Sequence, residues 1–102
     1  MTNSKRPKEG AVIAQAIPVV FKKIKPDVGW RESSPMIVCK NVFGPHGPCV
    51  EELDTKPETY LGQKALANPF EDTLTVTEFD VWYVTFEDGN YLELVGDELE
   101  FL

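Results

Sequence analysis

Cysteine and histidine side chains are the residues of this chain best suited to bind a metal or attack a substrate, and they lie close together. Cys39, His46 and Cys49 are its only cysteines and its only histidine, and they surround a loop rich in Gly and Pro. A zinc site of this kind needs a fourth ligand, which Glu51 or Asp54 would have to supply, an uncommon combination for a structural site. We therefore expect neither a metal nor another cofactor.

The same residues allow a cysteine nucleophile, with Cys39 or Cys49 as the thiolate and His46 as its base. No known family motif surrounds them, and a buried Cys39 with an exposed His46 is the more ordinary outcome. A bond between the two cysteines would suit an oxidising compartment. A pocket near Trp30, His46 and Cys49, in a small enzyme or ligand-binding protein, remains the alternative hypothesis for function.

Two apolar runs separated by FEDGN predict a β-hairpin over residues 81–95. A two-residue turn would bury Glu93 among apolar neighbours, which is costly for an unpaired carboxylate. A three-residue loop of Glu87, Asp88 and Gly89 avoids this cost and requires Gly89 at positive φ. This register turns one set of side chains to the core, namely Trp82, Val84, Phe86, Leu92 and Leu94.

The opposite face of this hairpin is the candidate binding surface. It carries Tyr83, Tyr91 and Glu93, with Asp80 and Glu87 on its rim. Tyrosine is enriched at protein interfaces because it combines a large contact area with a polar tip. The surface is expected to bind a basic protein partner, unless a second copy of the chain or another segment of the same chain covers it.

Charge is distributed unevenly along the chain, whose formal net charge is -7. Residues 1–40 hold eight Lys or Arg against three acids, a net of +5, and residues 41–102 hold two Lys against fourteen acids, a net of -12. Such asymmetry is either compensated inside the fold or presented to a basic partner. Direct nucleic-acid binding is not expected, because the acidic part would repel phosphates. No apolar run approaches the ~20 residues that span a bilayer.

The N-terminus predicts a mobile basic arm over residues 1–10, followed by a single globular domain over residues 11–102. The apolar run after the arm resembles part of a signal peptide, but Gln15 and Pro18 interrupt it. The expected location is therefore the cytoplasm.

The first half of the chain predicts strands over residues 11–17 and 36–42. Residues 18–25 fit either a short helix or a strand, because Pro18 suits the first turn of a helix but the preceding residues favour extended structure. FGPHGP, residues 43–48, is expected to end the second strand, since its prolines remove hydrogen-bond donors. Pairing is expected to resume over residues 49–53.

The second half predicts one helix at about residues 57–67, with Pro57 in its first turn and Pro69 after its end. Strands are expected over residues 72–79, in the hairpin, and at the C-terminus. The predicted fold class is α+β, a mostly antiparallel twisted sheet of five or six strands with this helix packed on it. The predicted function is a small, acidic, non-catalytic binding module of the inhibitor, antidote or adaptor type, with a self-associating homodimer as a further alternative.

Overall fold

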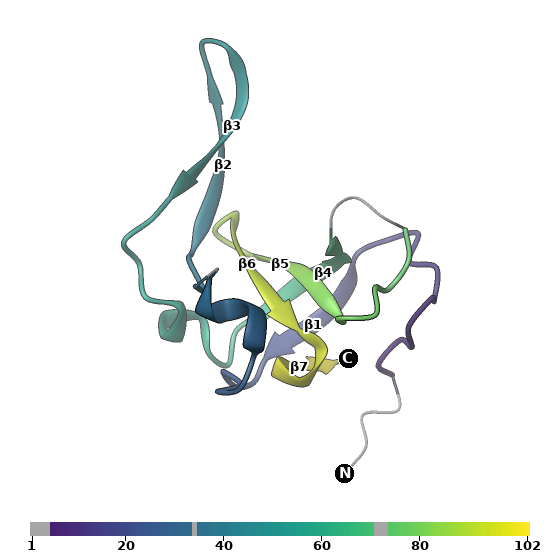
Figure 1. Cartoon of the computed structure of the whole chain (residues 1–102). Helices are drawn as coiled ribbons and strands as arrows, with labels where there is room; N and C mark the ends of the chain where they lie inside the picture. Colours follow the sequence, from purple (N-terminus) through teal and green to yellow (C-terminus); the bar gives the residue numbers. More distant parts are fainter. Residues whose placement is uncertain (1–4, 34, 71–73) are drawn as a thin grey trace.

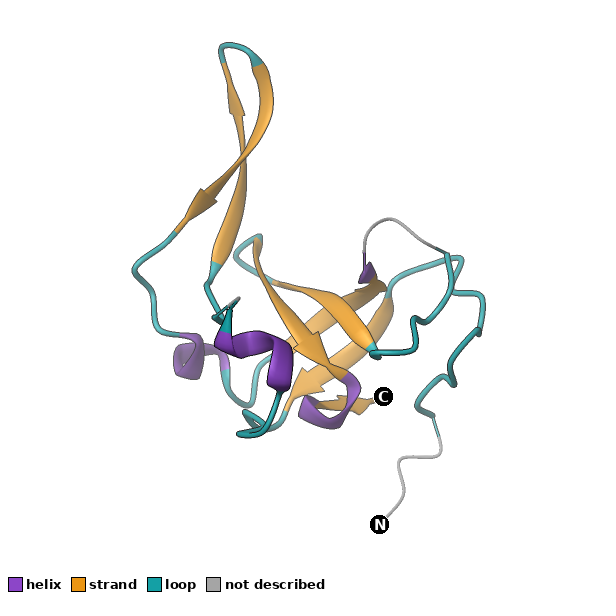
Figure 2. Cartoon of the chain, viewed as in Figure 1, coloured by secondary structure: helices purple, strands orange, loops and turns teal. Residues whose placement is uncertain are grey.

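Antiparallel strands dominate the computed structural model, which describes residues 5–33, 35–70 and 74–102 (Figures 1 and 2). The strands are β1 (Ile17–Phe21), β2 (Cys39–Gly44), β3 (Gly47–Glu52), β4 (Lys64–Pro69), β5 (Val81–Phe86), β6 (Asn90–Val95) and β7 (Leu99–Phe101). They form one sheet in the order β3-β2-β6-β5-β4-β1-β7. Among the described residues, 3-10 turns lie between strands at η1 (Gly29–Glu32), η2 (Pro57–Tyr60) and η4 (Gly96–Glu98).

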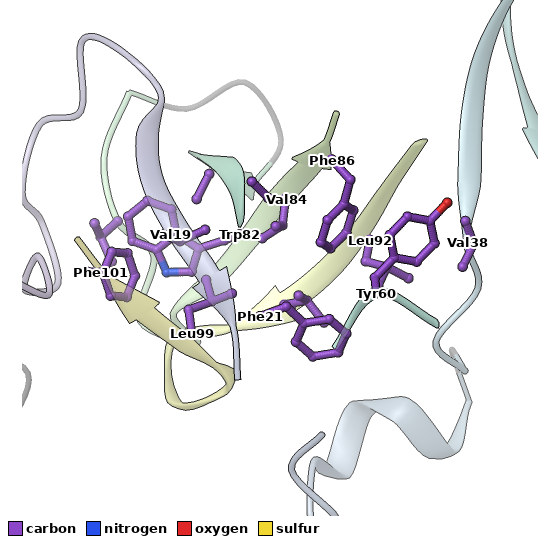
Figure 3. Close-up of a cluster of buried hydrophobic side chains, with 14 residues drawn as sticks. Val19, Phe21, Val38, Tyr60, Trp82, Val84, Phe86, Leu92, Leu99 and Phe101 are labelled. Atoms are coloured by element: carbon purple, nitrogen blue, oxygen red, sulfur yellow. The ribbon is translucent and has the colours of Figure 1, made fainter. Parts of the chain in front are cut away.

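The sheet curls so that its inner face encloses the core (Figure 3). Two strands, β4 and β1, lie between β5 and β7, which would separate β5 from β7 by about 14 Å in a flat sheet. The rings of Trp82 on β5 and Phe101 on β7 are nevertheless only 5.2 Å apart between centroids. The short turn η4 joins β6 to β7 and so links the two ends of the curled part.

Alternating side chains of these strands fill the core. Val19 and Phe21 point inward from β1, and Tyr60 of η2 packs against Phe86 at 4.4 Å between ring centroids. The five hairpin residues predicted to face the core are all buried. Burial of apolar side chains is the main favourable term in folding, so this closed inner face is what stabilises the sheet.

The helix predicted at about residues 57–67 is wrong, and with it the α+β class. Only Pro57–Tyr60 turns, as η2, and the chain then enters strand β4. Gly62 has φ +84°, a left-handed conformation that interrupts a helix. The residues after it alternate between exposed and buried positions, with Ala65 and Ala67 inside. This period of two is that of a strand, and the described chain is all-β.

The prediction of five or six strands is also wrong, because FGPHGP does not end the second strand. The strand β2 continues to Gly44, Pro45 and His46 form a two-residue turn, and β3 begins at Gly47. Proline is tolerated here because β3 is an edge strand, where Pro48 needs no partner on its outer side. The β2–β3 hairpin projects from the body (Figure 1) and pairs with β6 only through Cys39 and Lys40.

Two other strand predictions need correction. The segment over residues 11–17 is irregular except for a single bridge between Val12 and Thr75, and the first strand begins at Ile17 and runs through Pro18. The strand predicted over residues 72–79 is not formed in residues 74–79, and its first two residues lie outside the described ranges. The ambiguity over residues 18–25 resolves into strand to Phe21 and irregular chain beyond it.

Part of the charge asymmetry is compensated within the fold. Arg6 forms ion pairs with Asp80 and Asp97, and Lys25 binds Asp97 at 2.8 Å. Arg31 donates to both oxygens of the buried Glu98, from Nη1 to Oε2 at 2.8 Å and from Nη2 to Oε1 at 2.5 Å. Three cations from the basic part of the sequence thus hold η4 and the start of β5.

Candidate functional site

The β5–β6 hairpin has the predicted register. Val84 lies opposite Leu92, and Gly89 adopts φ +88° in a three-residue loop. Both predictions are confirmed. As a result Tyr83 and Tyr91 lie on the face of the sheet opposite the core, which we call the outer face.

The acidic turn of this hairpin has a structural role. Asp88 accepts a hydrogen bond from the Asn90 backbone N–H at 2.9 Å and another from the Tyr60 hydroxyl at 2.5 Å. Asn90 Nδ2 in turn donates to the Tyr60 hydroxyl at 2.8 Å. Burial and the Asp88 carboxylate raise the pKa of Tyr60, so its hydroxyl stays protonated and remains a donor. The exposed Glu87 is the turn acid that faces solvent.

An aromatic cluster lies on the outer face. Tyr83 is half-buried between Phe70, at 5.2 Å between ring centroids, and Tyr91, at 5.7 Å. Both pairs are inclined, at 57° and 71°, as edge-to-face contacts between rings prefer. Glu93 is also half-buried beside them. Other parts of the chain therefore cover this face only in part.

Three hollows follow one another over the outer face. The first, about 590 Å³, has in its lining Ile13, Asn41, Asn68, Tyr83, Thr85 and Tyr91. The second, about 130 Å³, has Trp30, Met36, Cys39, Glu52, Tyr91 and Glu93. The third, about 560 Å³, has Trp30, Phe70, Glu78, Phe79, Val81 and Glu93. Tyr91 is shared by the first two, and Trp30 and Glu93 by the last two, so the hollows are neighbours, and we call the three together the outer trough.

Two carboxylates lie close to the Cys39 thiol in the middle of the outer trough. Burial, followed by the nearby carboxylates of Glu52 and Glu93, raises the pKa of the Cys39 thiol. Burial also raises the pKa of Tyr91, with contributions from Cys39, Tyr83 and Glu93. Cys39 therefore carries no charge at neutral pH and is a poor nucleophile, because the thiolate is the reactive form.

The wall formed by Trp30 is held in place by its neighbour in η1. The Arg31 guanidinium lies 5.1 Å from the centroid of the Trp30 ring, and Arg31 Nη2 also donates to the Glu93 carbonyl at 3.3 Å. Its charge is balanced by the bidentate contact with Glu98. The contact therefore fixes η1 against the end of β6 and positions Trp30 at the trough.

Asp80, predicted on the rim, lies inside a network instead. Its Oδ1 accepts a hydrogen bond from the Trp82 indole N–H at 2.8 Å, and its other oxygen pairs with Arg6. Its backbone is left-handed at φ 54°, and its carbonyl accepts from the Gly96 N–H at 3.0 Å. These contacts position the start of β5. Among the described residues, the acids that line the trough are Glu52, Glu78 and Glu93.

The structure does not assemble the pocket predicted from Trp30, His46 and Cys49. His46 is exposed at the tip of the β2–β3 hairpin, and Cys49 is exposed on β3. The two hollows lined by Trp30 include neither residue. Both cysteines are free thiols. Within the described ranges, no three His, Cys, Asp or Glu side chains gather in a way that would hold a metal ion.

Comparison with known protein families, with curated proteins and with solved structures found no match for this chain. In the part of the chain that the structure describes, no helix is long and apolar enough to cross a membrane.

The sequence predicts the hairpin residues that line the outer trough, but not the residues that other segments contribute to it. Tyr83, Tyr91 and Glu93 follow from local register, whereas Phe70, Phe79 and Glu52 reach the site from other segments. Trp30 was singled out, but with the wrong neighbours. A Trp in a loop between two prolines was the available signal for a surface site.

Proposed function

We propose that this chain is a small non-catalytic binding module that holds a basic segment of a partner protein in the outer trough, acting as an inhibitor, antidote or adaptor. The observation that carries this proposal is the row of neighbouring hollows on the outer face, which share lining residues and are lined by aromatic rings and carboxylates. Half-buried Tyr and Trp side chains are the usual anchors of protein interfaces.

The shape of the outer trough favours an extended segment over a compact metabolite. Two hollows of about 590 and 560 Å³ lie on either side of a narrow one of about 130 Å³. Asn41, Asn68 and Thr85 line the first hollow, and their amide and hydroxyl groups can both donate to and accept from a peptide backbone. These side chains thus offer polar contacts to a chain that lies across the outer face.

Charge favours a basic segment. The ion pairs of Arg6, Lys25 and Arg31 use cations of the chain itself, and the net charge remains -7. Glu52 and Glu93 lie in the middle of the trough. A surface of this sign accelerates encounter with a cationic partner, an effect that salt screens.

Selection from a phage-displayed library of random twelve-residue peptides tests this proposal with a defined probe. The expected result is enrichment of peptides that combine Lys or Arg with apolar residues, and at least tenfold weaker binding at 500 mM than at 50 mM NaCl. Recovery of acidic or uncharged peptides, or affinities that do not depend on salt, would contradict the proposal.

A pair of variants places the binding on the trough. Tyr91→Ala removes the ring shared by two hollows and should weaken a selected peptide by about tenfold, the usual scale for an interface anchor. Phe43→Ala removes an exposed ring of the β2–β3 hairpin that lines none of the three hollows, and it should change the affinity by less than about twofold. Thermal unfolding of both variants confirms that each is folded. Equal losses in the two variants would argue against the trough.

Self-association is a second candidate, and a separate observation favours it. Phe43 is 86% exposed and Val50 is 55% exposed on the projecting β2–β3 hairpin. Exposed apolar side chains on a projecting edge are common at contacts between chains. Sedimentation velocity tests this candidate. A dimer that Phe43→Ser converts to a monomer supports it, and a protein that is still monomeric at about 100 µM contradicts it.

A cytoplasmic location belongs to the same proposal. The free thiols of Cys39 and Cys49 suit a reducing compartment, where disulfides are rare.

A further inference from the structure

The narrow hollow in the middle of the outer trough has a composition unlike the other two. It combines two aromatic rings, Trp30 and Tyr91, with two carboxylates, Glu52 and Glu93, and with the sulfur-bearing side chains of Met36 and Cys39. Its volume of about 130 Å³ equals the space of about four water molecules. That space suits one extended side chain and is below the range of pockets that hold whole metabolites.

The sheet register brings these groups together from three neighbouring strands. Cys39 of β2 lies opposite Glu52 of β3 on one side and opposite Tyr91 of β6 on the other. Residues directly opposite each other on adjacent strands have side chains on the same face, about 5 Å apart. Glu93 follows Tyr91 by two residues and therefore shares its face. The two carboxylates thus lie on either side of the Cys39–Tyr91 pair.

We propose that this narrow hollow binds the cationic side chain of a Lys or Arg residue in the partner segment. The inference rests on the proposed function, because it specifies which side chain of the partner the outer trough recognises. The aromatic faces attract the cation and contact its methylene stem, and the carboxylates accept hydrogen bonds from its N–H groups.

Charges nearby agree with this assignment. Burial raises the pKa of the Cys39 thiol, and the carboxylates of Glu52 and Glu93 raise it further, so both carboxylates lie close enough to act on the centre of the hollow. The cation nearest to Trp30 within the chain, Arg31, is already neutralised by Glu98 and is held against η1. Arg31 therefore adds little net positive charge beside the hollow.

Terminally blocked pentapeptides that differ only at the central residue test the inference. Ac-Ala-Ala-X-Ala-Ala-NH2 is titrated into the intact protein with X as Lys, Arg, norleucine or Glu, and the Trp30 indole N–H resonance is followed by NMR. The Lys and Arg peptides are expected to bind at least about fivefold more tightly than the norleucine peptide, which matches Lys in its stem but carries no charge. The buried Trp82 indole serves as the internal reference, because its resonance should not move.

Two glutamate variants provide the matched control. Glu52→Gln removes one carboxylate of the hollow and should weaken the Lys peptide by about fivefold. Glu51→Gln makes the same change one residue earlier, on the opposite face of β3, and should leave the affinity unchanged. Both positions are exposed, so neither substitution is expected to unfold the protein.

The outcomes separate this inference from the proposed function. Equal binding of the Lys and norleucine peptides, or equal effects of Glu52→Gln and Glu51→Gln, overturns the cation site. Binding of a library-selected peptide that depends on Tyr91 but not on its Lys or Arg overturns the cation site while supporting the trough. Binding of the Lys pentapeptide with the predicted Glu52 dependence, without any selected peptide, supports the cation site and counts against the larger binding function.

Discussion

At position 89 the backbone is in a conformation that only glycine adopts without strain. Gly89 has φ +88°, and a Cβ there would meet no atom within 4 Å, so the backbone alone sets the requirement. Gly89→Ala should lower the free energy of unfolding by about 1 kcal/mol, measured by urea denaturation. Gly29→Ala is the control: Gly29 is not left-handed and its Cβ site is also open, so the change should stay within about 0.5 kcal/mol. Equal stabilities for the two variants would contradict the role of φ.

Another glycine shows why some residue roles were not predictable from the sequence. A Cβ on Gly96 would collide with the Asp80 carboxylate and lie 2.7 Å from Arg6 Nε. Gly89 lies in a turn that the neighbouring residues predict. At Gly96, by contrast, the space that a Cβ would take is occupied by an ion pair between residues far apart in the chain. Asp80 likewise resembled a solvated acid at a strand end, because its partners Arg6 and Trp82 become apparent only in the folded chain.

Among the connecting elements, η4 depends on one buried carboxylate. Glu98 is 0% exposed and accepts from Arg31, from the Val95 N–H at 3.0 Å and from the Lys25 N–H at 2.9 Å. Glu98→Gln leaves Arg31, whose side chain is only 12% exposed, without its counter-charge. The expected loss is about 3 kcal/mol in the free energy of unfolding, measured by urea denaturation.

The exposed Glu100 on β7 supplies the matched comparison for this element. Glu100→Gln should change the free energy of unfolding by less than about 0.5 kcal/mol. If Glu98→Gln were equally mild, η4 would not depend on the buried pair.

Element prediction succeeded where periodicity was unambiguous and failed where turn chemistry competed with it. The β5–β6 hairpin was predicted correctly because FEDGN admits one loop length that keeps Glu93 out of the core. The helix over 57–67 was wrong because Pro57 and the spacing of Leu61 and Ala65 fit a helix equally well, while tertiary pairing of β4 with β1 and β5 decided for a strand. The β2–β3 hairpin was predicted to be interrupted at FGPHGP. Edge strands tolerate proline, but which strand lies at the edge depends on the sheet order, which the local sequence does not give.

For the whole molecule, charge compensation makes stability depend on pH in a defined window. Hydrogen bonds from Lys25 and Arg6 lower the pKa of Asp97 from its usual value near 3.8 to about 2. A lowered folded-state pKa means that the stabilisation is present above about pH 4 and is lost as the pH falls through about 2. Asp97→Asn should therefore remove part of the loss of stability between pH 4 and pH 2, measured from denaturation midpoints.

The comparison variant for this experiment is Asp27→Asn, at an exposed position after Lys25. It should keep the wild-type change of midpoint over the same pH range. An Asp97→Asn protein with an unchanged pH dependence would show that the pairs with Arg6 and Lys25 contribute nothing in solution.

The part of the candidate site that lies on the β5–β6 hairpin was predictable from the sequence, whereas the parts that other segments contribute were not. The outward direction of Tyr83 and Tyr91 follows from a period of two, and the acidic character follows from composition. The walls come from η1, from β3 and from the segments next to β4 and β5, so no local pattern places Trp30 and Glu52 beside Tyr91. The hollows therefore depend on how segments far apart in the chain meet beside the outer face.

Photo-cross-linking locates directly the basic segment that we propose to lie in the outer trough. A library-selected peptide carrying benzophenone next to its Lys or Arg is irradiated with the intact protein, and mass spectrometry identifies the modified residues. Cross-links are expected on Met36, Trp30 and Tyr91, which line the narrow hollow. Cross-links confined to the tip of the β2–β3 hairpin or to β7, with none on these three residues, would contradict it.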